Sequence, residues 1–549
     1  MSSYFELLLR FDPNGLRDAA KSWRGLSSSV READIRHRSQ VNGPLRHMKW
    51  SGKDAEYAFS TLERTEQILE IVRVESAAVA LALDTVADRM YQAQTNLRNA
   101  VHRAEEWGLS IASDGTVNLP VQSYADQHDA DGQADRKALV TLRGEAQERV
   151  NKALTDAREA SDKGDLALSR LDADILTRPR VFGAAAETAR DVRDVEKDLG
   201  LTSPYIPENT DPQKSADWWK SLTPEQQAGY LALHPDQVGQ LDGLPSTVRD
   251  EANRLVLEQQ LDELKSGDAR GSGLTFEEYN KREGALRELK ERLDQQDGES
   301  AEKQLFLLGL DAKGDGKAIV ALGNPDTADH TAVMVPGTGT TLASMPGQIT
   351  RVTALQDSAI DAGHGNKNVS VISWLGYDAP EIPPESLGVM GTGRANDGAE
   401  AMRRFTTGTR VAQGDHHSHL TVIGHSYGTT AVGAAAAGGQ GLGADDIVAI
   451  ASPGMTVTEA EKLHIDPSHF WVGAADDDNI RKVAGLTLGD DPMFEGFGGN
   501  NIQIDTSGHS GYWDENSQSL ANQGRIIAGQ PPNTVPKEAE VDPNVAPGI

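Results

Sequence analysis

Residues 420–428, Leu-Thr-Val-Ile-Gly-His-Ser-Tyr-Gly, decide the fold of the C-terminal half of this chain. The first four form an apolar, β-branched run that predicts a short strand. The residues from 429 to 435 are mostly small and predict a helix that can come close to its neighbours. Glycines on both sides of the serine let the backbone turn tightly between strand and helix. We expect the turn to present the Ser426 hydroxyl at the helix N-terminus, where partial positive charge favours an anion.

This strand, turn and helix with Gly-x-Ser-x-Gly resembles the nucleophile elbow of α/β hydrolases. Serine alone is a poor nucleophile, so a histidine must take its proton and a carboxylate must fix the imidazole. Asp478 and His509 follow Ser426 in the chain order of the α/β-hydrolase triad. Asp476 and Asp477 are alternatives for the acid. We favour Asp478 because Asp-Asn-Ile is similar to the Asp-x-Ile/Val found after this strand in many hydrolases.

Acyl transfer also needs backbone donors for the developing oxyanion. One donor should be the N–H of Tyr427, which directly follows the serine. The other should come from Gly337 or Thr338, in the loop after the predicted strand 332–335. Further residues near the catalytic end of the sheet are expected to line a substrate pocket; they are Trp374, Tyr377 and His425.

Short apolar runs separated by glycine, proline and polar residues predict a sheet in this half of the chain. Helix-length segments between the later runs indicate mostly parallel strands, whereas the short turns between the first runs indicate antiparallel pairing. Catalytic residues should then lie beyond the carboxyl ends of the strands. The predicted strands are 305–308, 318–322, 332–335, 369–372, 420–423, 447–450 and 470–472, and residues 501–505 could form the last one.

The cluster Asp415-His416-His417-Ser418-His419 contains residue types that bind metals. It precedes a predicted strand, so it should lie at the opposite end of the sheet from Ser426. We interpret it as a solvated loop, and we expect neither a metal nor an organic cofactor.

The N-terminal half is predicted to be helical. Apolar residues at heptad spacing from 53 to 107 predict one helix roughly 80 Å long. Residues 14–38 carry the same spacing, and the segment between them suits a reversal, so we expect an antiparallel helical hairpin. A further helix is predicted over 133–177, a tight turn over 114–117, and a compact helical module after a proline-containing connector over 184–215.

The tripeptide Trp50-Ser51-Gly52 between two such helices resembles the turn of the WXG-type helical proteins exported by the type VII (ESX) secretion system. The export signal of that family, Tyr-x-x-x-Asp/Glu, does not follow the second helix. A matching spacing occurs only downstream, from Tyr279 to Glu283. The resemblance implies a secretion partner or a homodimer through these helices, with a cytoplasmic location or a type VII-like export route and no classical signal peptide.

Five separated motifs in the C-terminal half, in order, resemble an actinobacterial α/β-hydrolase family formerly labelled a domain of unknown function. The resemblance covers roughly residues 300 to 530 and implies a serine hydrolase fold. The motifs are 335–338, 373–380, 424–428, 451–454 and the region around His509.

The composition bounds the remaining function classes. The chain has 549 residues, too many for one core, and a formal net charge of -30 that disfavours nucleic acid. It has no cysteine, and no run of about 20 apolar residues that could span a bilayer. We therefore predict a multidomain protein, mainly α and then α/β: a helical domain over 1–182, a linker and small helical module over 183–299, an α/β-hydrolase domain over 300–530 and a disordered tail over 531–549.

The leading hypothesis is a serine hydrolase of the esterase or lipase type that acts on a small acyl or ester substrate through an acyl-enzyme. The alternative is a secretion-associated interaction or scaffold protein with a degenerate hydrolase domain.

Overall fold

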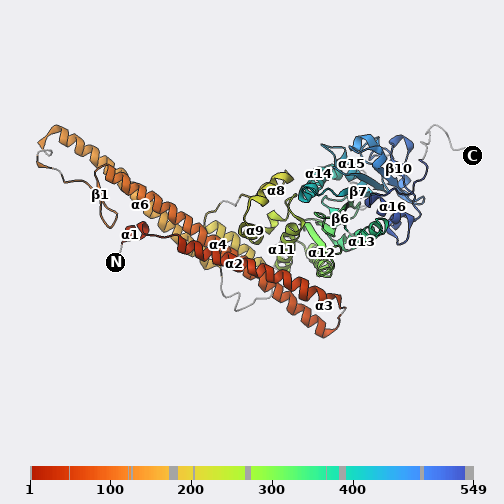
Figure 1. Ribbon diagram of the computed structural model, residues 1–549, viewed down its shortest axis with the longest axis horizontal. Coiled ribbons are helices and arrows are strands. Elements are labelled where there is room, and N and C mark those ends of the chain that lie inside the picture. The colour runs from red at the N-terminus through yellow and green to blue at the C-terminus, as the bar shows by residue number, and fades with distance from the viewer. Residues whose placement is uncertain are drawn as a thin grey trace, which may run out of the picture. The chain divides into compact units, whose positions relative to one another are not determined.

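The computed structural model describes residues 3–48, 50–121, 123–124, 128–171, 184–201, 205–265, 274–366, 368–381, 391–482 and 487–537. Two compact units make up the chain. The first combines Met1–Asp34 with Gln67–Tyr205, and the second combines Ile35–Glu66 with Ile206–Ile549. Figure 1 labels their helices and strands. In the described residues no helix is long and apolar enough to cross a membrane.

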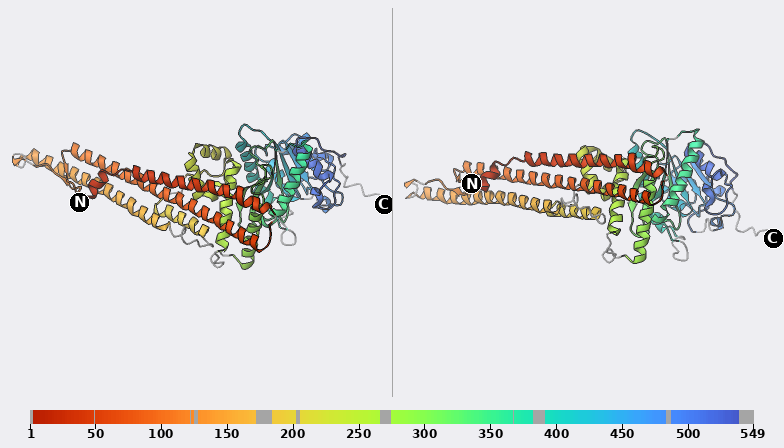
Figure 2. Two further views of the ribbon diagram at one scale, coloured as in Figure 1. Left: turned by 60° about the horizontal axis from the view of Figure 1, so that its bottom comes forward. Right: turned by 90° about the horizontal axis from the view of Figure 1, so that it is seen from below.

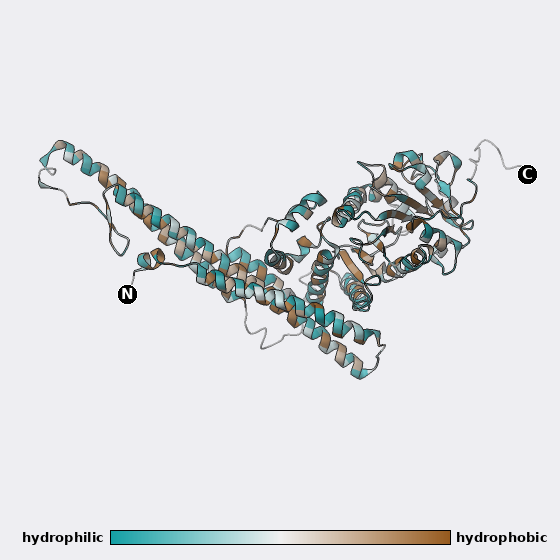
Figure 3. Cartoon of the chain, viewed as in Figure 1, coloured by the Kyte–Doolittle hydropathy of each residue, from teal (hydrophilic) through white to brown (hydrophobic). Residues whose placement is uncertain are grey.

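Two long helices confirm the predicted hairpin. They are α2 (Asn14–His37) and α4 (Lys53–Glu106), and α4 has 54 residues. Within the first unit they run antiparallel, because Arg17 pairs with Asp88 at 2.7 Å and Arg24 pairs with Asp84. Figure 3 shows polar and apolar residues alternating along these helices, as a narrow apolar seam requires.

The other elements of the first unit pack on α4. A short helix α1 (Tyr4–Leu9) and the third long helix α6 (Ala130–Arg170) bury Leu8, Leu97 and Val150 in one core. Strands β1 (Ser110–Ile111) and β2 (Val117–Asn118) pair antiparallel, which confirms the predicted turn.

One expectation for this unit is wrong. Residues from 184 were predicted to be a connector, but Ala184–Asp198 form a helix, α7. Val195 and Leu199 of this segment are buried against Ala167 of α6. This apolar contact stabilises the helix, whereas the prolines on either side of the segment had suggested a connector. The predicted end of α6 near Pro179 lies outside the described residues.

The second unit begins with the tip of the hairpin, where α2 continues into a π-helical turn (Arg38–Asn42) and α3 (Gly43–His47). The tip contacts the helix 276–294 and the turn that follows it. Arg46 lies 3.5 Å from Asp294, and a Cβ on Gly43 would lie 1.9 Å from the carbonyl oxygen of Asp297. Only glycine allows so close a backbone approach.

The segment predicted as a compact helical module is helical, and it belongs to the same unit as the sheet. Thr223 and Gln226 form a capping box at the start of α9. Figure 2 shows α11 and α12 side by side, and apolar residues of both join the core of the sheet. The helices are α8 (Pro212–Ser221), α9 (Pro224–Leu233), α10 (Pro235–Val238), α11 (Ser246–Lys265) and α12 (Phe276–Asp294).

An eight-stranded sheet forms the rest of this unit, with the order β10-β9-β8-β7-β5-β6-β4-β3. Strand β4 pairs antiparallel with both β3 and β6, and all the other pairs are parallel, as predicted. The strands are β3 (Leu305–Asp311), β4 (Lys317–Leu322), β5 (His330–Val335), β6 (Val369–Leu375), β7 (His419–His425), β8 (Asp446–Ile450), β9 (Phe470–Gly473) and β10 (Asn500–Asn501).

The last strand is shorter than predicted, because residues beyond Asn501 pair with a later segment. Ile502 forms an antiparallel bridge with Thr534, and the Gln503 N–H donates to the Asn533 carbonyl at 2.9 Å. Residues 531–537 of the expected tail are therefore described and partly paired, whereas residues 538–549 lie outside the described residues.

Helices cover the sheet in two packed pairs. Helix α13 (Met345–Ala362) packs against α16 (Gln518–Ile527), and α14 (Gly393–Gln413) packs against α15 (Tyr427–Ala436). Figure 1 shows β6 and β7 between these pairs. The sheet core is thus buried on both faces, as the apolar strands require.

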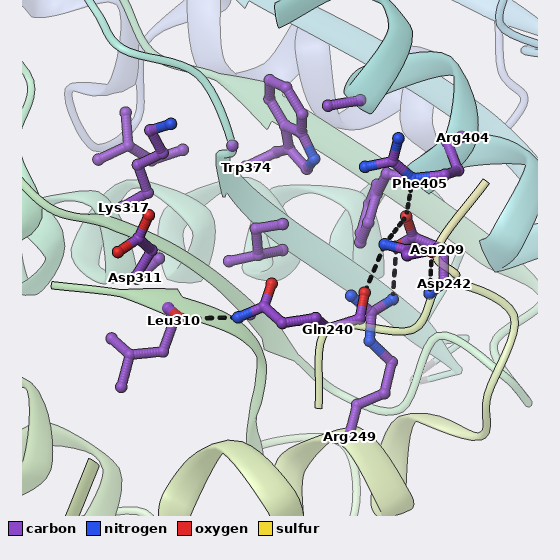
Figure 4. Close-up of a pocket in the computed structure, with 16 residues that line it drawn as sticks. Asn209, Gln240, Asp242, Arg249, Leu310, Asp311, Lys317, Trp374, Arg404 and Phe405 are labelled. Atoms are coloured by element: carbon purple, nitrogen blue, oxygen red, sulfur yellow. Dashed lines mark hydrogen bonds and ion pairs between the residues drawn. The ribbon is translucent and has the colours of Figure 1, made fainter. Parts of the chain in front are cut away.

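A small polar cavity of about 170 Å³ lies where the helical module meets the sheet. Figure 4 shows Asp242 on one wall of this cavity, where it pairs with Arg249 at 3.0 Å and with Arg404 at 2.9 Å. Asp242 is only 4% exposed, so the two guanidinium groups neutralise a buried charge. Trp374 lines the far side of this cavity.

Candidate active site

Ser426 occupies a strained turn between β7 and α15. Its φ of 54° lies in the left-handed region, which a residue with a side chain rarely adopts. The turn needs glycine on both sides: a Cβ on Gly424 would lie 2.6 Å from the Thr429 Cα, and one on Gly428 would lie 2.2 Å from the Val335 carbonyl oxygen. The predicted strand, turn and helix around the serine are therefore present. Close packing against the neighbouring backbone keeps Ser426 in its strained conformation.

Hydrogen bonds from β8 and the residues after it hold the turn at Ser426 in place. The Ser426 N–H donates to the Ile450 carbonyl at 2.9 Å. The Thr429 hydroxyl donates to the Ser426 carbonyl at 2.7 Å and lies 2.7 Å from the Ser452 hydroxyl. These contacts leave the Ser426 Oγ without a hydrogen-bond partner among the residues that the structure describes.

His509 is paired with one aspartate of the three candidates. Its Nδ1 lies 2.8 Å from Oδ2 and 3.0 Å from Oδ1 of Asp478. Asp477 instead accepts a hydrogen bond from the Gly508 N–H at 2.8 Å, so it holds the backbone beside the histidine. The structure therefore brings Asp478, and not Asp477, to the imidazole.

Tyr512 completes this pair, although the sequence analysis gave it no role. Its hydroxyl donates to Asp478 Oδ2 at 2.7 Å and accepts from the Ala475 N–H at 3.0 Å. Burial raises the pKa of the Asp478 carboxyl, but hydrogen bonds from Tyr512, the Ile480 N–H and His509 outweigh it and leave the pKa below its usual range. Asp478 is thus an ionised acceptor.

An ionised carboxylate determines the histidine tautomer. A carboxylate only accepts, so His509 Nδ1 carries the hydrogen, and Nε2 holds a free lone pair in the neutral ring. Among the described residues no hydrogen bond links this ring to Ser426, yet both residues line the same cavity. A nucleophile and base placed in this way often tighten only when substrate binds.

The shared cavity has a volume of about 800 Å³. It brings together most of the residues predicted for the site, and its size would take a small organic ester. The predicted residues that line it are Ser426, His509, Tyr427, Gly337, Thr338 and His425.

The predicted oxyanion loop lies against the elbow. A Cβ on Gly337 would lie 2.8 Å from the Ser426 Cβ and 3.0 Å from the Tyr427 nitrogen, so the two backbones are in contact. Tyr427 is the first residue of α15, and its N–H therefore has no acceptor within the helix. Both predicted sources of oxyanion donors border the serine.

Trp374 and Tyr377 lie elsewhere than expected. Both side chains are almost completely buried, and their rings stack at 6.2 Å. Neither lines the cavity of Ser426. The Tyr377 hydroxyl donates to the Pro336 carbonyl at 2.7 Å, so this tyrosine stabilises the loop that contains Gly337 and Thr338. Their place after an apolar strand predicted that both side chains line the substrate pocket, but both rings are packed in the core instead.

His425 lines the cavity as a neutral residue. Burial, together with the nearby His509 and Arg351, lowers its pKa to about 3. Its Nε2–H donates to the His509 carbonyl at 3.0 Å, which fixes the backbone that carries the paired imidazole.

The histidine cluster at residues 415–419 lies at the amino end of β7, away from the carboxyl ends that carry Ser426. His419 is paired there with Asp446 at 2.8 Å, and His416 contacts the Ala328 carbonyl at 2.9 Å. The cluster therefore contributes to the opposite rim of the sheet, as its place before the strand predicted.

Comparison with known proteins agrees with this architecture. Residues 311–488 match a protein family described as Alpha/beta hydrolase. The uncharacterized proteins MT2140 and Rv2079 of two Mycobacterium tuberculosis strains are each 31% identical to this chain over 363 residues, 57% of this chain and 55% of theirs. The uncharacterized protein Mb0988c of Mycobacterium bovis is 29% identical over 232 residues, 40% of this chain and 83% of its own length.

This chain thus spans about half the length of the first two relatives. The family match covers the sheet from the end of β3 to beyond β9, including the elbow. The matched segment of the C-terminal half is similar to α/β hydrolases, and its mostly parallel sheet has the fold expected of that family.

Proposed function

We propose that this protein is a serine hydrolase that cleaves an ester or related acyl bond through an acyl-enzyme on Ser426. The observation that carries the proposal is the pairing of His509 with Asp478 in the cavity that also holds the serine. A free lone pair on an oriented imidazole is what a serine needs to become a nucleophile.

In the proposed reaction, Ser426 Oγ attacks the acyl carbonyl carbon while His509 Nε2 takes the hydroxyl proton. The tetrahedral oxyanion is held by the N–H of Tyr427 and by an N–H of the loop that contains Gly337 and Thr338. The imidazolium gives its proton to the leaving alcohol as the carbon–oxygen bond breaks. A water molecule, deprotonated by His509, then attacks the acyl-serine. As the acyl–Oγ bond breaks, the imidazolium returns its proton to Ser426 Oγ and the acid is released.

A fluorophosphonate probe tests this proposal directly, because it phosphonylates only an activated serine. We expect the native protein to be labelled and Ser426→Ala to be unlabelled. Ser510→Ala is the matched control, since Ser510 lines the same cavity without lying on the elbow. Absence of labelling in the folded native protein would contradict the proposal and favour a scaffold with a degenerate hydrolase domain.

We also propose that the N-terminal hairpin is an interaction module of the WXG type that is exported by a type VII-like route. Trp50-Ser51-Gly52 lies between α3 and α4, and Gly52 has a φ of 102° that suits the reversal. Trp50 is 44% exposed and its ring lies 6.1 Å from that of Phe59, so a partner could reach it.

Export is tested by expressing the chain in an actinobacterial host with an intact or a disabled type VII system. We expect the protein in the culture filtrate of the intact host alone, and less of it for Trp50→Ala. Equal retention in the cells of both hosts would contradict this second proposal and leave the hydrolase proposal untouched.

A further inference from the structure

The cavity of Ser426 has a polar wall that the proposed reaction does not use. Ser344, Gly347, Gln348 and Arg351 all line it. They lie at and just after the start of α13 with spacings of three, four and seven, so they share one face of that helix. Side chains from this face point toward the space that a substrate would fill.

Arg351 has no counter-ion on this wall. Among the described residues it makes no ion pair and no hydrogen bond, and its guanidinium group lies over the Trp513 ring at 4.4 Å from the centroid. Burial lowers its pKa from the usual arginine value. By contrast, the buried Arg249 of this unit is paired with Asp242. An unpaired, partly buried cation is costly unless an anion joins it.

Two neighbouring side chains each hold a buried oxygen that has no hydrogen-bond partner among the described residues. One is Oε1 of Gln348, which is 5% exposed, and the other is Oγ1 of Thr338. Buried polar groups normally have partners, so these side chains are set to bind something that enters the cavity. The Thr338 hydroxyl can donate to an oxygen, and Gln348 can donate through Nε2 while its Oε1 accepts.

The charged residues that line the cavity favour an anionic ligand. The chain carries a formal net charge of -30, yet the residues described as lining this cavity include no aspartate or glutamate. Among the residues described as lining the cavity, Arg351 is therefore the one whose side chain is charged at all physiological pH values. A guanidinium group binds carboxylate and phosphate oxygens through paired N–H donors and is favoured for that purpose.

We propose that Arg351, with Gln348 and Thr338, binds an anionic group of the substrate, so that the preferred substrates are esters bearing a carboxylate or a phosphate-type group away from the scissile bond. This inference rests on the proposed function, because it names the substrate class of the same site. The Trp513 ring beneath the guanidinium group holds the cation in place for the anion.

The test compares 4-nitrophenyl esters of equal chain length that end in a methyl group, a carboxylate or a phosphonate. An adipate-length chain is used so that the carboxylate does not attack its own ester. We expect native kcat/KM to be at least tenfold higher for an anionic ester than for the neutral one. The better of the two anionic esters identifies the group.

Arg351→Met keeps the packing on Trp513 and removes the charge. We expect it to lose at least tenfold in kcat/KM on anionic esters, to keep its activity on the neutral ester and to retain fluorophosphonate labelling. Arg351→Lys should recover part of the preference, because lysine keeps the charge but not the paired donors. Arg525→Met is the matched control, since Arg525 lies on α16 outside the cavity and has no ion-pair partner among the described residues.

Binding without turnover separates this inference from the proposed function. Calorimetric titration of Ser426→Ala with the three esters should show tighter binding of an anionic ester, and the added Arg351→Met change should abolish the difference. Labelling of the native protein with no preference for negative charge would overturn the inference alone. Absence of labelling would overturn the catalytic proposal, and the titration would then still decide whether Arg351 binds anions.

Discussion

Nδ1 of His509 lies 2.8 Å from Oδ2 of Asp478, whose side chain is almost completely buried. The carboxylate also accepts from Tyr512 and from the Ile480 N–H. A buried charge with this many donors is held in one orientation, and the imidazole is oriented with it. The rest of the proposed chemistry depends on this pair, because it sets which ring nitrogen faces the cavity.

The first prediction concerns the acid itself. Asp478→Asn keeps the shape of the side chain but lets the other tautomer of His509 form, so kcat should fall by about 10⁴-fold, the size known for the same change in a serine protease triad. Asp477→Asn is the matched control, because its partner is the Gly508 N–H and not the imidazole, and it should lose less than tenfold. Ester hydrolysis at pH 8 measures both. Equal losses in the two variants would contradict the assignment.

The second prediction concerns the oxyanion loop. Gly337→Ala would place a methyl group 2.7 Å from the His425 carbonyl oxygen and 2.8 Å from the Ser426 Cβ, so the loop or the elbow must shift. We expect at least a 100-fold loss in kcat, since one misplaced oxyanion donor costs about that much. Gly347→Ala has no atom within 4 Å of the new methyl group on the same cavity wall, and it should keep its activity and be slightly more stable.

Local patterns predicted the elements of this fold because their causes are local. The heptads gave the bounds of α4 to within a residue at either end, and the glycines around Ser426 fixed the elbow because no other residue fits those backbone contacts. Helix α7 was missed since its apolar stripe is short, and only packing against Ala167 makes it a helix.

The site was predictable only in part, because its geometry depends on distant segments. Three adjacent aspartates look alike in sequence, and only the path of the chain between β9 and β10 brings Asp478 under the imidazole of His509. Arg351 enters the cavity from a helix far upstream, and no motif marks it. Trp374 was expected in the substrate pocket because it lies at the catalytic end of a strand, but its side chain lines the cavity that contains Asp242.

The third prediction concerns pH and stability. The pKa of folded His425 is lowered to about 3 by burial and by the nearby His509 and Arg351, whereas an unfolded histidine has a pKa near 6.5. Between pH 6.5 and pH 3, His425 is protonated in the unfolded chain but not in the folded chain. The free energy of unfolding therefore decreases as the pH falls from 6.5 toward 3. The loss from this one group approaches about 1.4 kcal/mol per pH unit within that window.

Urea unfolding at pH 7.5, 6 and 5 checks this effect. His425→Gln should show a shallower fall in the unfolding midpoint, because glutamine does not titrate and its amide can still donate to the His509 carbonyl. His417→Gln is the control, since His417 is exposed, and its slope should equal that of the native protein. Parallel slopes for all three proteins would show that His425 is already protonated or exposed when folded.

The last prediction concerns the joint between the helical module and the sheet. Asp242 is buried between Arg249 and Arg404, so Asp242→Asn leaves two guanidinium groups without their counter-charge. Breaking a buried pair from one side costs about 3–5 kcal/mol, and the urea midpoint of the C-terminal unit should fall accordingly. Asp236→Asn on α10 is the control, because Asp236 is exposed and has no ion pair among the described residues. Since the Asp242 pairs are screened from water, the loss should be nearly the same at low and high salt, whereas a strong salt dependence would mean that the joint is open to solvent.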